Sequence, residues 1–313
     1  MTRGDLRVAV VGVGHLGRHH ARLLAAMDGV NLVGVVDTSE SRAAEIAVSA
    51  GCAAYTSWQA VAGDIDAVTI AVPTEAHAEV ALGFIAQGVH VLVEKPLARS
   101  VGEAETLIAA ASARGVRLAV GHTERFNPAV TVAQGLLRHP RFIEAHRLGT
   151  FPERSLDIDV VFDLMIHDLD LLLAIVGEPV VTVEAVGVPV LTPRIDIANV
   201  RLTFAGGCIA NLTASRISRD RVRKIRFFQP QSYLSIDYAA QEVEHWTLGG
   251  GPAGRPEILG GKLDVLKDEP LRCELEDFVL AVRDGRAPRV TGEQGRDALR
   301  LATTIVERMH HVR

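Results

Sequence analysis

Apolar and polar positions alternate in two regular ways along the first 121 residues. Short runs rich in Val and Ile predict buried strands at residues 7–11, 31–36, 66–72, 90–93 and 116–120. Amphipathic stretches between these runs predict helices at residues 16–27, 39–50, 75–87 and 101–113. Strands that alternate with helices need crossover connections. The pattern therefore predicts an α/β domain with a doubly wound parallel sheet and helices on both faces.

The pattern changes after residue 121. Helices are expected at residues 128–138 and 160–176, with a strand at 143–150 between them. Extended runs separated by turn signals fill residues 180–238 and predict a largely antiparallel open sheet. Residues 249–261 are expected to form a loop because they are rich in glycine, and closing helices are expected at 271–283 and 293–312. We therefore expect two domains, an α/β domain at residues 1–121 and an α+β domain at residues 122–313.

The composition is that of an ordinary globular protein. Apolar residues make up 48% and charged residues 23% of the 313 positions, which excludes a wholly disordered chain or a fibre. The net charge of −5 and the 4% aromatic content argue against a nucleic-acid or anionic membrane surface. Three cysteines without a CxxC pair predict no disulfide framework or thiolate zinc site, and the sequence shows no export signal. We expect a cytoplasmic protein with a small polar ligand.

A glycine motif follows the first predicted strand and opens the first predicted helix. Gly12, Gly14 and Gly17 form the pattern G-x-G-x-x-G, and Asp37 follows the second strand twenty residues later. Such glycines permit a tight turn and close approach to a pyrophosphate, while the acid binds ribose hydroxyls and repels a 2′-phosphate. The motif predicts a Rossmann site for NAD rather than NADP, with an ordinary glycine turn as the alternative and Arg42 as a solvated helix charge. The expected cofactor residues here are Gly12, Gly14, His15, Leu16, Gly17, Asp37 and Thr38.

The fourth predicted strand ends in Glu94, Lys95 and Pro96. Ligands of open α/β sheets bind at the carboxyl ends of the strands. A partly desolvated lysine at such an end, beside a cationic nicotinamide, would have a lowered pKa and would exchange protons with a substrate hydroxyl. The alternative is a surface lysine followed by a helix start at Pro96.

Ionisable residues occur on the apolar helix at residues 160–176. Asp163 and His167 are four positions apart and share one face with Asp170, whereas Asp168 points away. Such a stripe is costly unless it lines a cavity or finds partners, so a catalytic site and a buried Asp–His pair at a domain interface are both open. A metal site is disfavoured because neighbouring helix residues diverge. In a catalytic site His167 would accept a proton from the substrate, and Asp163 would fix the orientation of the His167 ring. Lys95 would polarise the substrate hydroxyl or relay its proton. The sequence leaves the order of Lys95 and His167 in the proton path open.

These motifs resemble the Gfo/Idh/MocA family of sugar and polyol oxidoreductases. The resemblance covers most of residues 6–128 and the helix at 160–176, including Ala-Val-Pro-Thr-x-x-His at 71–77 and Glu-Lys-Pro at 94–96. It implies that Lys95, Asp163 and His167 surround the reacting carbinol. It also implies that further cofactor contacts come from Pro73, Thr74, His77, Glu94, Lys95 and Arg125. The histidines outside this set, such as the neighbours His19 and His20, are expected at the surface or in packing.

Further substrate contacts are expected at two places. Asn127, like Arg125, lies where the chain enters the second domain, and hydrogen bonding at that junction is the alternative role for both. Six of the eleven residues from 216 to 226 are basic. Such a run forms a solvated or oligomer-facing strand, or Arg216 grips a diphosphate together with Arg154. The expected substrate residues are Lys95, Asn127, Arg154, Asp163, His167 and Arg216.

Residues 123–128 and 157–168 are most similar to one branch of the family. That branch oxidises the 3-hydroxyl of UDP-N-acetylglucosamine to a 3-keto sugar, which a partner aminotransferase converts to the amino sugar of lipid A. The resemblance implies an NAD-dependent dehydrogenase acting on CH–OH groups, joined through its C-terminal sheet into a homodimer or homotetramer, with no metal, nucleic acid or membrane partner. The alternatives are an inositol, polyol or simple-sugar dehydrogenase, an NAD-using glycosidase and a non-catalytic NAD-binding regulator.

Overall fold

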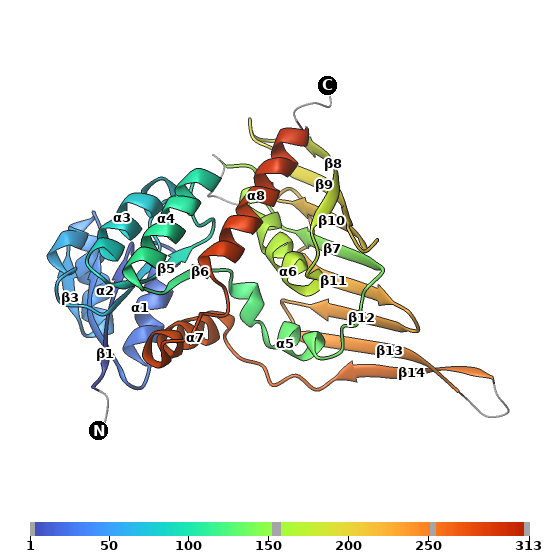
Figure 1. Ribbon diagram of the computed structural model, residues 1–313, viewed down its shortest axis with the longest axis horizontal. Helices are drawn as coiled ribbons and strands as arrows, with labels where there is room; N and C mark the ends of the chain where they lie inside the picture. The colour runs from blue at the N-terminus through green and yellow to red at the C-terminus, as the bar shows by residue number, and fades with distance from the viewer. Residues whose placement is uncertain (1–3, 152–157, 251–254, 310–313) are drawn as a thin grey trace. The chain divides into compact units, whose positions relative to one another are not determined.

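The computed structural model describes residues 4–151, 158–250 and 255–309. The chain divides into two compact units, which are considered separately (Figure 1). Unit 1 runs to Thr123 and also includes Leu271–Leu299. Unit 2 covers Glu124–Pro270 and continues from Arg300. Leu271–Leu299 thus packs within unit 1, whereas the sequence pattern placed it in the second domain.

Unit 1 is built on a six-stranded sheet. Its order is β3-β2-β1-β4-β5-β6, and every neighbouring pair is parallel. The chain moves outward from β1 to β3, returns to the centre at β4 and moves outward again to β6. This confirms the predicted doubly wound sheet, to which the structure adds the short edge strand β3. The strands are β1 (Leu6–Val11), β2 (Val30–Val36), β3 (Ala53–Tyr55), β4 (Ala67–Ile70), β5 (His90–Glu94) and β6 (Leu118–Gly121).

Helices cover both faces of this sheet. Leu24 and Phe278 share one apolar core with Val8 and Val10 of β1, which places their helices α1 and α7 on the same face. Because the crossovers are right-handed, α3 and α4 lie on the opposite face, where Figure 1 shows them side by side. Burial of both faces explains why β1 is continuously apolar. The helices are α1 (Gly17–Ala25), α2 (Glu40–Ala50), α3 (Thr74–Ala86), α4 (Val101–Arg114) and α7 (Pro270–Asp284), with the short η1 (Trp58–Ala60).

Unit 2 contains an eight-stranded sheet. Its order is β14-β13-β12-β11-β7-β10-β9-β8, in which β7 and β10 are parallel and the other pairs are antiparallel. The predicted, largely antiparallel sheet is therefore confirmed. The strands are β7 (Phe142–Leu148), β8 (Val180–Val188), β9 (Ile197–Phe204), β10 (Ile209–Ser215), β11 (Val222–Gln229), β12 (Ser232–Asp237), β13 (Glu242–Gly250) and β14 (Pro256–Leu263).

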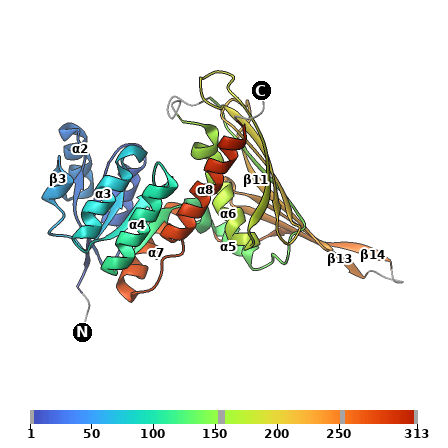
Figure 2. The same ribbon diagram turned by 45° about the horizontal axis from the view of Figure 1, so that its top comes forward.

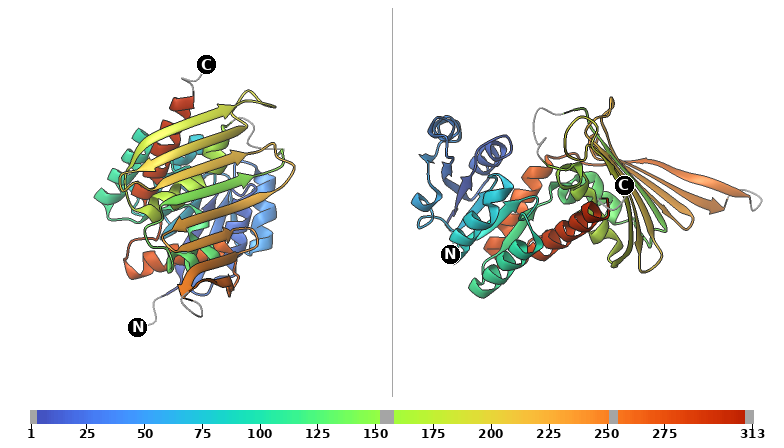
Figure 3. Two further views of the ribbon diagram at one scale, coloured as in Figure 1. Left: turned by 90° about the vertical axis from the view of Figure 1, so that its right-hand side faces the viewer. Right: turned by 90° about the horizontal axis from the view of Figure 1, so that it is seen from above.

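One face of this sheet is covered by helices and the other is open. The covering elements are α5 (Pro128–Gln134), the π-helical turn η3 (Val161–Met165) and α6 (Ile166–Val176), as Figure 2 shows. Figure 3 (left) looks onto the other face, where none of the described helices crosses the strands. The chain passes between the units in three elements, namely η2 (Thr123–Phe126), the start of α7, and α8 (Gly292–Met309), which begins in unit 1 and ends in unit 2.

The prediction of a loop at residues 249–261 is wrong. β13 extends to Gly250, and most of the remaining described residues pair with it as β14. Glycine serves the strand pairing here, because a Cβ on Gly260 would lie 2.0 Å from the carbonyl oxygen of His245, and the φ of Gly260 is +131°. A glycine-rich composition therefore marked close backbone approach rather than a loop. Among the described residues, no helix is both long enough and apolar enough to cross a membrane.

Candidate active site

The predicted residues of unit 1 lie at one edge of its sheet. Parallel strands end at the same edge, which is where open α/β sheets bind ligands. The glycine loop follows β1, Asp37 and Thr38 follow β2, Pro73 and Thr74 follow β4, and Lys95 follows β5. Thr38 and Pro73 are exposed there, and Lys95 is half-buried.

The glycine loop fits a dinucleotide. Gly12 has a φ of +83°, and a Cβ on it would lie 2.7 Å from the carbonyl group of Ala71. A Cβ on Gly17 would lie 1.7 Å from the carbonyl oxygen of Gly12, so α1 can begin this close to the turn only with glycine. By contrast, a Cβ on Gly14 would meet nothing within 4 Å, so the backbone there borders open space. Open space at a helix N-terminus is what a pyrophosphate requires.

Asp37 is held beside this loop. Its carboxylate accepts hydrogen bonds from the backbone N–H groups of Val13 (3.1 Å) and Ser39 (2.9 Å), and it is buried. The guanidinium of Arg42 lies 3.2 Å from Asp37 Oδ1, so this residue is an ion-pair partner and not only the solvated helix charge expected from the sequence. The carboxylate is therefore fixed at the strand end where an adenosine ribose binds in Rossmann folds.

Glu94 and His20 form a buried pair next to Lys95. His20 Nε2 lies 3.0 Å from Glu94 Oε1, and the backbone N–H of Lys95 donates to Glu94 Oε2 at 3.2 Å. Neither side chain of the pair is more than 7% exposed. Glu94, expected as a cofactor contact, thus connects α1 to the residue that carries the predicted catalytic amine. His20 was expected at the surface or in packing, although its position three residues after Gly17, on the buried face of α1, was a usable signal.

His77 joins the same region from α3. Its Nδ1 lies 2.9 Å from the carbonyl oxygen of Pro96, and its Nε2 lies 2.9 Å from that of Val72. Burial lowers the pKa of His77, against the two carbonyl contacts, which raise it. The ring therefore bridges the loop after β4 and the loop after β5, so that His77 holds Lys95's loop in place.

Asp163 and His167 lie at the start of the apolar helix in unit 2. The expected regular helix begins with the π-helical turn η3, in which the backbone N–H of Ile166 bonds to the carbonyl of Val161. Asp163 belongs to this turn and His167 to the first turn of α6, and both side chains are half-buried. π-helical turns are rare and frequently occur at functional sites.

The other two acids of this helix are ion-paired inside unit 2. Asp168 receives a bidentate pair from Arg147 of β7, Nε to Oδ2 at 2.8 Å and Nη2 to Oδ1 at 2.9 Å. Asp170 lies 3.4 Å from Nη1 of Arg125. Asp170 was expected to share the stripe of Asp163, but its buried arginine partner gives it a structural role.

Two predicted contact residues point into the interior of unit 2. Arg125 is buried against Asp170, as described above. The side chain of Asn127 accepts the N–H of Ala129 at 3.1 Å, which caps α5, and donates to the carbonyl oxygen of Tyr238 at 3.0 Å. The junction hydrogen bonding weighed as the alternative therefore describes these contacts. Arg154 lies outside the described residues.

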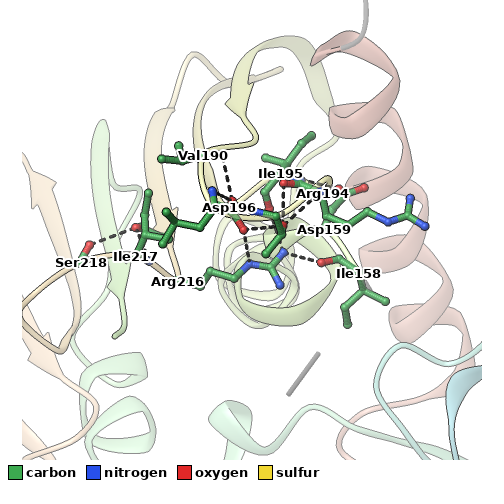
Figure 4. A network of polar contacts seen from close by, with 12 residues as sticks. Ile158, Asp159, Val190, Arg194, Ile195, Asp196, Arg216, Ile217 and Ser218 are labelled. Carbon is green, nitrogen blue, oxygen red and sulfur yellow. Dashed lines mark hydrogen bonds and ion pairs between the residues drawn. The ribbon is translucent and has the colours of Figure 1, made fainter. Parts of the chain in front are cut away.

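Arg216 is an internal anchor rather than an exposed cation. Its side chain is 1% exposed, and its Nε lies 3.3 Å from Asp196 Oδ1. Its Nη2 donates to the carbonyl oxygens of Ile195, at 2.9 Å, and Ile158 (Figure 4). All of these donors face protein acceptors. The expectation that Arg216 binds a diphosphate is therefore wrong.

The same network fixes the chain just before η3. Asp159 Oδ1 accepts the N–H of Ile195 at 2.9 Å, and the N–H of Val160 bonds to the carbonyl of Ile195 at 2.9 Å. The backbone N–H of Asp163 in turn bonds to the carbonyl of Asp159 at 3.2 Å. Figure 4 shows Arg216 and Asp196 at the centre of this network. Among the described residues no cluster of three His, Cys, Asp or Glu side chains is suited to a metal ion.

Both units resemble known oxidoreductases. Residues 6–122 match the model of the oxidoreductase family with an NAD-binding Rossmann fold, and residues 130–229 match the GFO/IDH/MocA C-terminal domain. A UDP-N-acetylglucosamine 3-dehydrogenase of Acidithiobacillus ferrooxidans is 41% identical over 302 residues, 96% of each chain. A solved structure of a protein of that name from the same organism has a TM-score of 0.92 and 39% identity over 98% of each chain. A myo-inositol 2-dehydrogenase of Thermotoga maritima is 27% identical over 95% of this chain and 94% of its own. The chain belongs to the Gfo/Idh/MocA family of NAD-binding oxidoreductases.

Proposed function

We propose that the protein oxidises the 3-hydroxyl of UDP-N-acetylglucosamine to a 3-keto sugar with NAD. The observation that carries the substrate is the 41% identity, over 96% of both chains, to a relative named for this reaction. The chemistry of the two units supports it, because unit 1 has an NAD-type glycine loop and unit 2 presents Asp163 and His167. We assign cofactor binding to unit 1 and substrate binding to unit 2.

The proposed reaction divides between hydride and proton transfer. Bound NAD supplies the hydride acceptor. Lys95, Asp163 and His167 serve the substrate hydroxyl, whose proton must leave as the carbon–hydrogen bond breaks. His167 accepts that proton, Asp163 fixes the tautomer and orientation of the imidazole, and Lys95 polarises the oxygen or relays the proton. The proton reaches His167 directly or through Lys95, so the loss of either side chain should slow the transfer.

A substrate panel tests the proposal. UDP-N-acetylglucosamine, N-acetylglucosamine, an inositol and a simple sugar are each incubated with NAD or NADP, and reduced nicotinamide is followed by its absorbance. We expect turnover with the nucleotide sugar and NAD, increased when a coupled amination removes the ketone. Robust turnover of an inositol without turnover of the nucleotide sugar would overturn the substrate assignment.

Two other functions give different outcomes in the same panel. A glycosidase that uses NAD transiently would release UDP without net nicotinamide reduction. A non-catalytic NAD-binding regulator would bind NAD and turn over nothing, and its function would survive Lys95→Ala and His167→Ala. A cytoplasmic location and a place in lipid A synthesis follow from the proposed substrate and stay predictions.

We infer that the open face of the eight-stranded sheet joins copies of the chain. A row of aromatic side chains crosses this face, from Phe142 through Phe228 and Tyr233 to Trp246, with ring centroids 5.5 Å and 5.2 Å apart at the first two steps. Such a surface is typical of subunit interfaces. Light scattering should therefore show a homodimer or homotetramer, and Trp246→Glu should lower its mass. A monomeric wild-type protein would contradict this.

A further inference from the structure

Three residues of the basic run at 216–226 lie on β11 and divide between its two faces, namely Arg223, Lys224 and Arg226. Side chains alternate along a strand, and the buried Ile225 and Phe227 mark the helix-covered face. Lys224 and Arg226 therefore lie on the open face. There Lys224 pairs with Asp237 at 3.2 Å and Arg226 with Glu144 at 3.5 Å. Arg223 alternates with Lys224 and points to the helix-covered face.

The pairing of β11 with β7 supports this orientation. Arg223 and Arg147 are direct cross-strand partners, and directly opposed residues of an antiparallel pair point to the same face. Arg147 is buried on the covered face. The backbone N–H of Tyr238 donates to the carbonyl oxygen of Arg223 at 2.9 Å, and the Tyr238 ring lies 5.2 Å from the Arg147 guanidinium. Arg223 thus sits at the rim of the cluster formed by Arg147, Tyr238 and Asp168.

The carboxylates near this cluster form ion pairs with Arg147. Asp168 binds it in the bidentate pair, and Glu124 Oε1 lies 3.2 Å from its Nη1. No described carboxylate forms an ion pair with Arg223, whose side chain is exposed. Burial of part of the side chain lowers the pKa of Arg223, and the charges of Arg147 and Arg221 lower it further, against the charges of Glu124 and Asp168, which raise it. An anion placed here would relieve this repulsion.

The position also suits the substrate. Asp168, whose charge acts on Arg223, belongs to α6, the helix that also carries His167. Arg221 adds a second guanidinium at the rim, where its Nη2 donates to Thr150 Oγ1 at 3.3 Å. Paired guanidinium groups match phosphate oxygens in geometry and charge, which favours a diphosphate over a neutral sugar.

We propose that Arg223, assisted by Arg221, binds the diphosphate of a nucleotide-sugar substrate. The assignment rests on the proposed function and transfers to Arg223 the role first expected of Arg216. It makes Arg223 a specificity residue that separates phosphorylated from neutral sugars. A purely solvated arginine is the competing outcome.

Calorimetric titration of the NAD-loaded full-length protein with UDP tests this assignment. Arg223→Gln removes the charge at the rim, and Arg226→Gln removes the same charge from the opposite face of the same strand as a matched control. We expect about 10- to 100-fold weaker UDP binding for Arg223→Gln, the loss of a charge-assisted pair, and no change for Arg226→Gln. Arg223→Lys should recover part of the affinity because it keeps the charge. Raising the salt concentration should weaken UDP binding less in Arg223→Gln than in the wild type.

The outcomes separate this assignment from the proposed function. Equal UDP affinity in the wild type and Arg223→Gln, or no UDP binding at all, overturns the role of Arg223. UDP binding that depends on Arg223, without turnover of the nucleotide sugar, supports the site and overturns the reaction. Turnover with an unchanged KM in Arg223→Gln supports the reaction and overturns the site. Thermal melting of each variant verifies that the changes do not come from unfolding.

Discussion

The strand-end loops of unit 1 and the helix-covered face of unit 2 organise polar chemistry in different ways. In unit 1, short local motifs create the site, and its essential features are backbone: the turn at Gly12, the close helix start at Gly17 and the open space beside Gly14. In unit 2, ion pairs between distant residues create the site. Arg147 occupies Asp168 across 21 positions, Arg125 occupies Asp170, and Arg216 occupies Asp196. Local backbone geometry thus defines the candidate site of unit 1, whereas in unit 2 long-range ion pairs give Asp168, Asp170 and Asp196 structural roles.

The largest expected effect comes from the two residues that we assign to proton transfer, one in each unit. Lys95→Met and His167→Asn should each lower kcat about 10²- to 10⁴-fold, the range of general acid–base catalysis. Because the glycine loop is intact in both variants, NAD affinity measured by fluorescence titration should stay near the wild-type value in His167→Asn. A His167→Asn protein with wild-type kcat would remove unit 2 from the chemistry.

A buried pair of unit 2 should matter more to stability than a surface pair of the same sheet. Asp168→Ala leaves the buried Arg147 charge without its bidentate partner and should cost about 3–5 kcal/mol in the free energy of unfolding. Lys224→Ala removes the exposed partner of Asp237 and should cost about 0–1 kcal/mol. Urea unfolding measures both. Similar losses in the two variants would contradict the greater structural role of the buried Asp168–Arg147 pair.

The glycine loop offers a matched pair of alanine substitutions. Gly17→Ala should destabilise unit 1 by about 1–3 kcal/mol, since the new Cβ would overlap the Gly12 carbonyl oxygen. Gly14→Ala meets no protein atom and should leave thermal stability unchanged, while it weakens NAD binding about tenfold by intruding on the pyrophosphate space. Unchanged NAD affinity in Gly14→Ala would argue against a dinucleotide at this loop.

Acid should act on the two units in different pH ranges. Burial holds the pKa of His77 below its ordinary value of about 6.5. The unfolded chain therefore takes up a proton first, and the stability that neutral His77 provides is full above about pH 6.5 and is lost as the pH falls. For Asp196, burial acts to raise the pKa, but the N–H groups of Leu191, Thr192 and Val190 outweigh it and hold the pKa at about 2.

The stability that Asp196 provides is therefore present above its ordinary pKa of about 3.8 and is lost as the pH falls towards 2. Thermal melting between pH 7.5 and pH 5.5 should show a decrease that is smaller in His77→Gln, with a slope of up to about 1.4 kcal/mol per pH unit for one group. Asp196→Asn should flatten the decrease in the lower range instead. A smaller decrease between pH 7.5 and pH 5.5 in Asp196→Asn, or a smaller decrease in the lower range in His77→Gln, would contradict this prediction.

The sequence predicted what depends on local spacing. The glycine motif, the lysine at a strand end and the Asp163–His167 spacing were all visible within short windows. The roles of Arg216 and Asp170 were not, because their partners are set by strand register and helix packing. Arg223 falls between these cases: buried Ile225 and Phe227 alternate with Lys224 and Arg226 in the sequence, but which face the helices cover appears only in the fold.

The central claim, hydride transfer from carbon 3 of a nucleotide sugar to NAD, has one direct test. UDP-N-acetylglucosamine carrying deuterium at carbon 3 is incubated with the protein and NAD, and the reduced nicotinamide is analysed by mass spectrometry. We predict deuterated reduced nicotinamide in amounts equal to the 3-keto sugar formed, with formation about 10²- to 10⁴-fold slower in Lys95→Met. Reduced nicotinamide without deuterium, or UDP release without any reduced nicotinamide, would contradict the account.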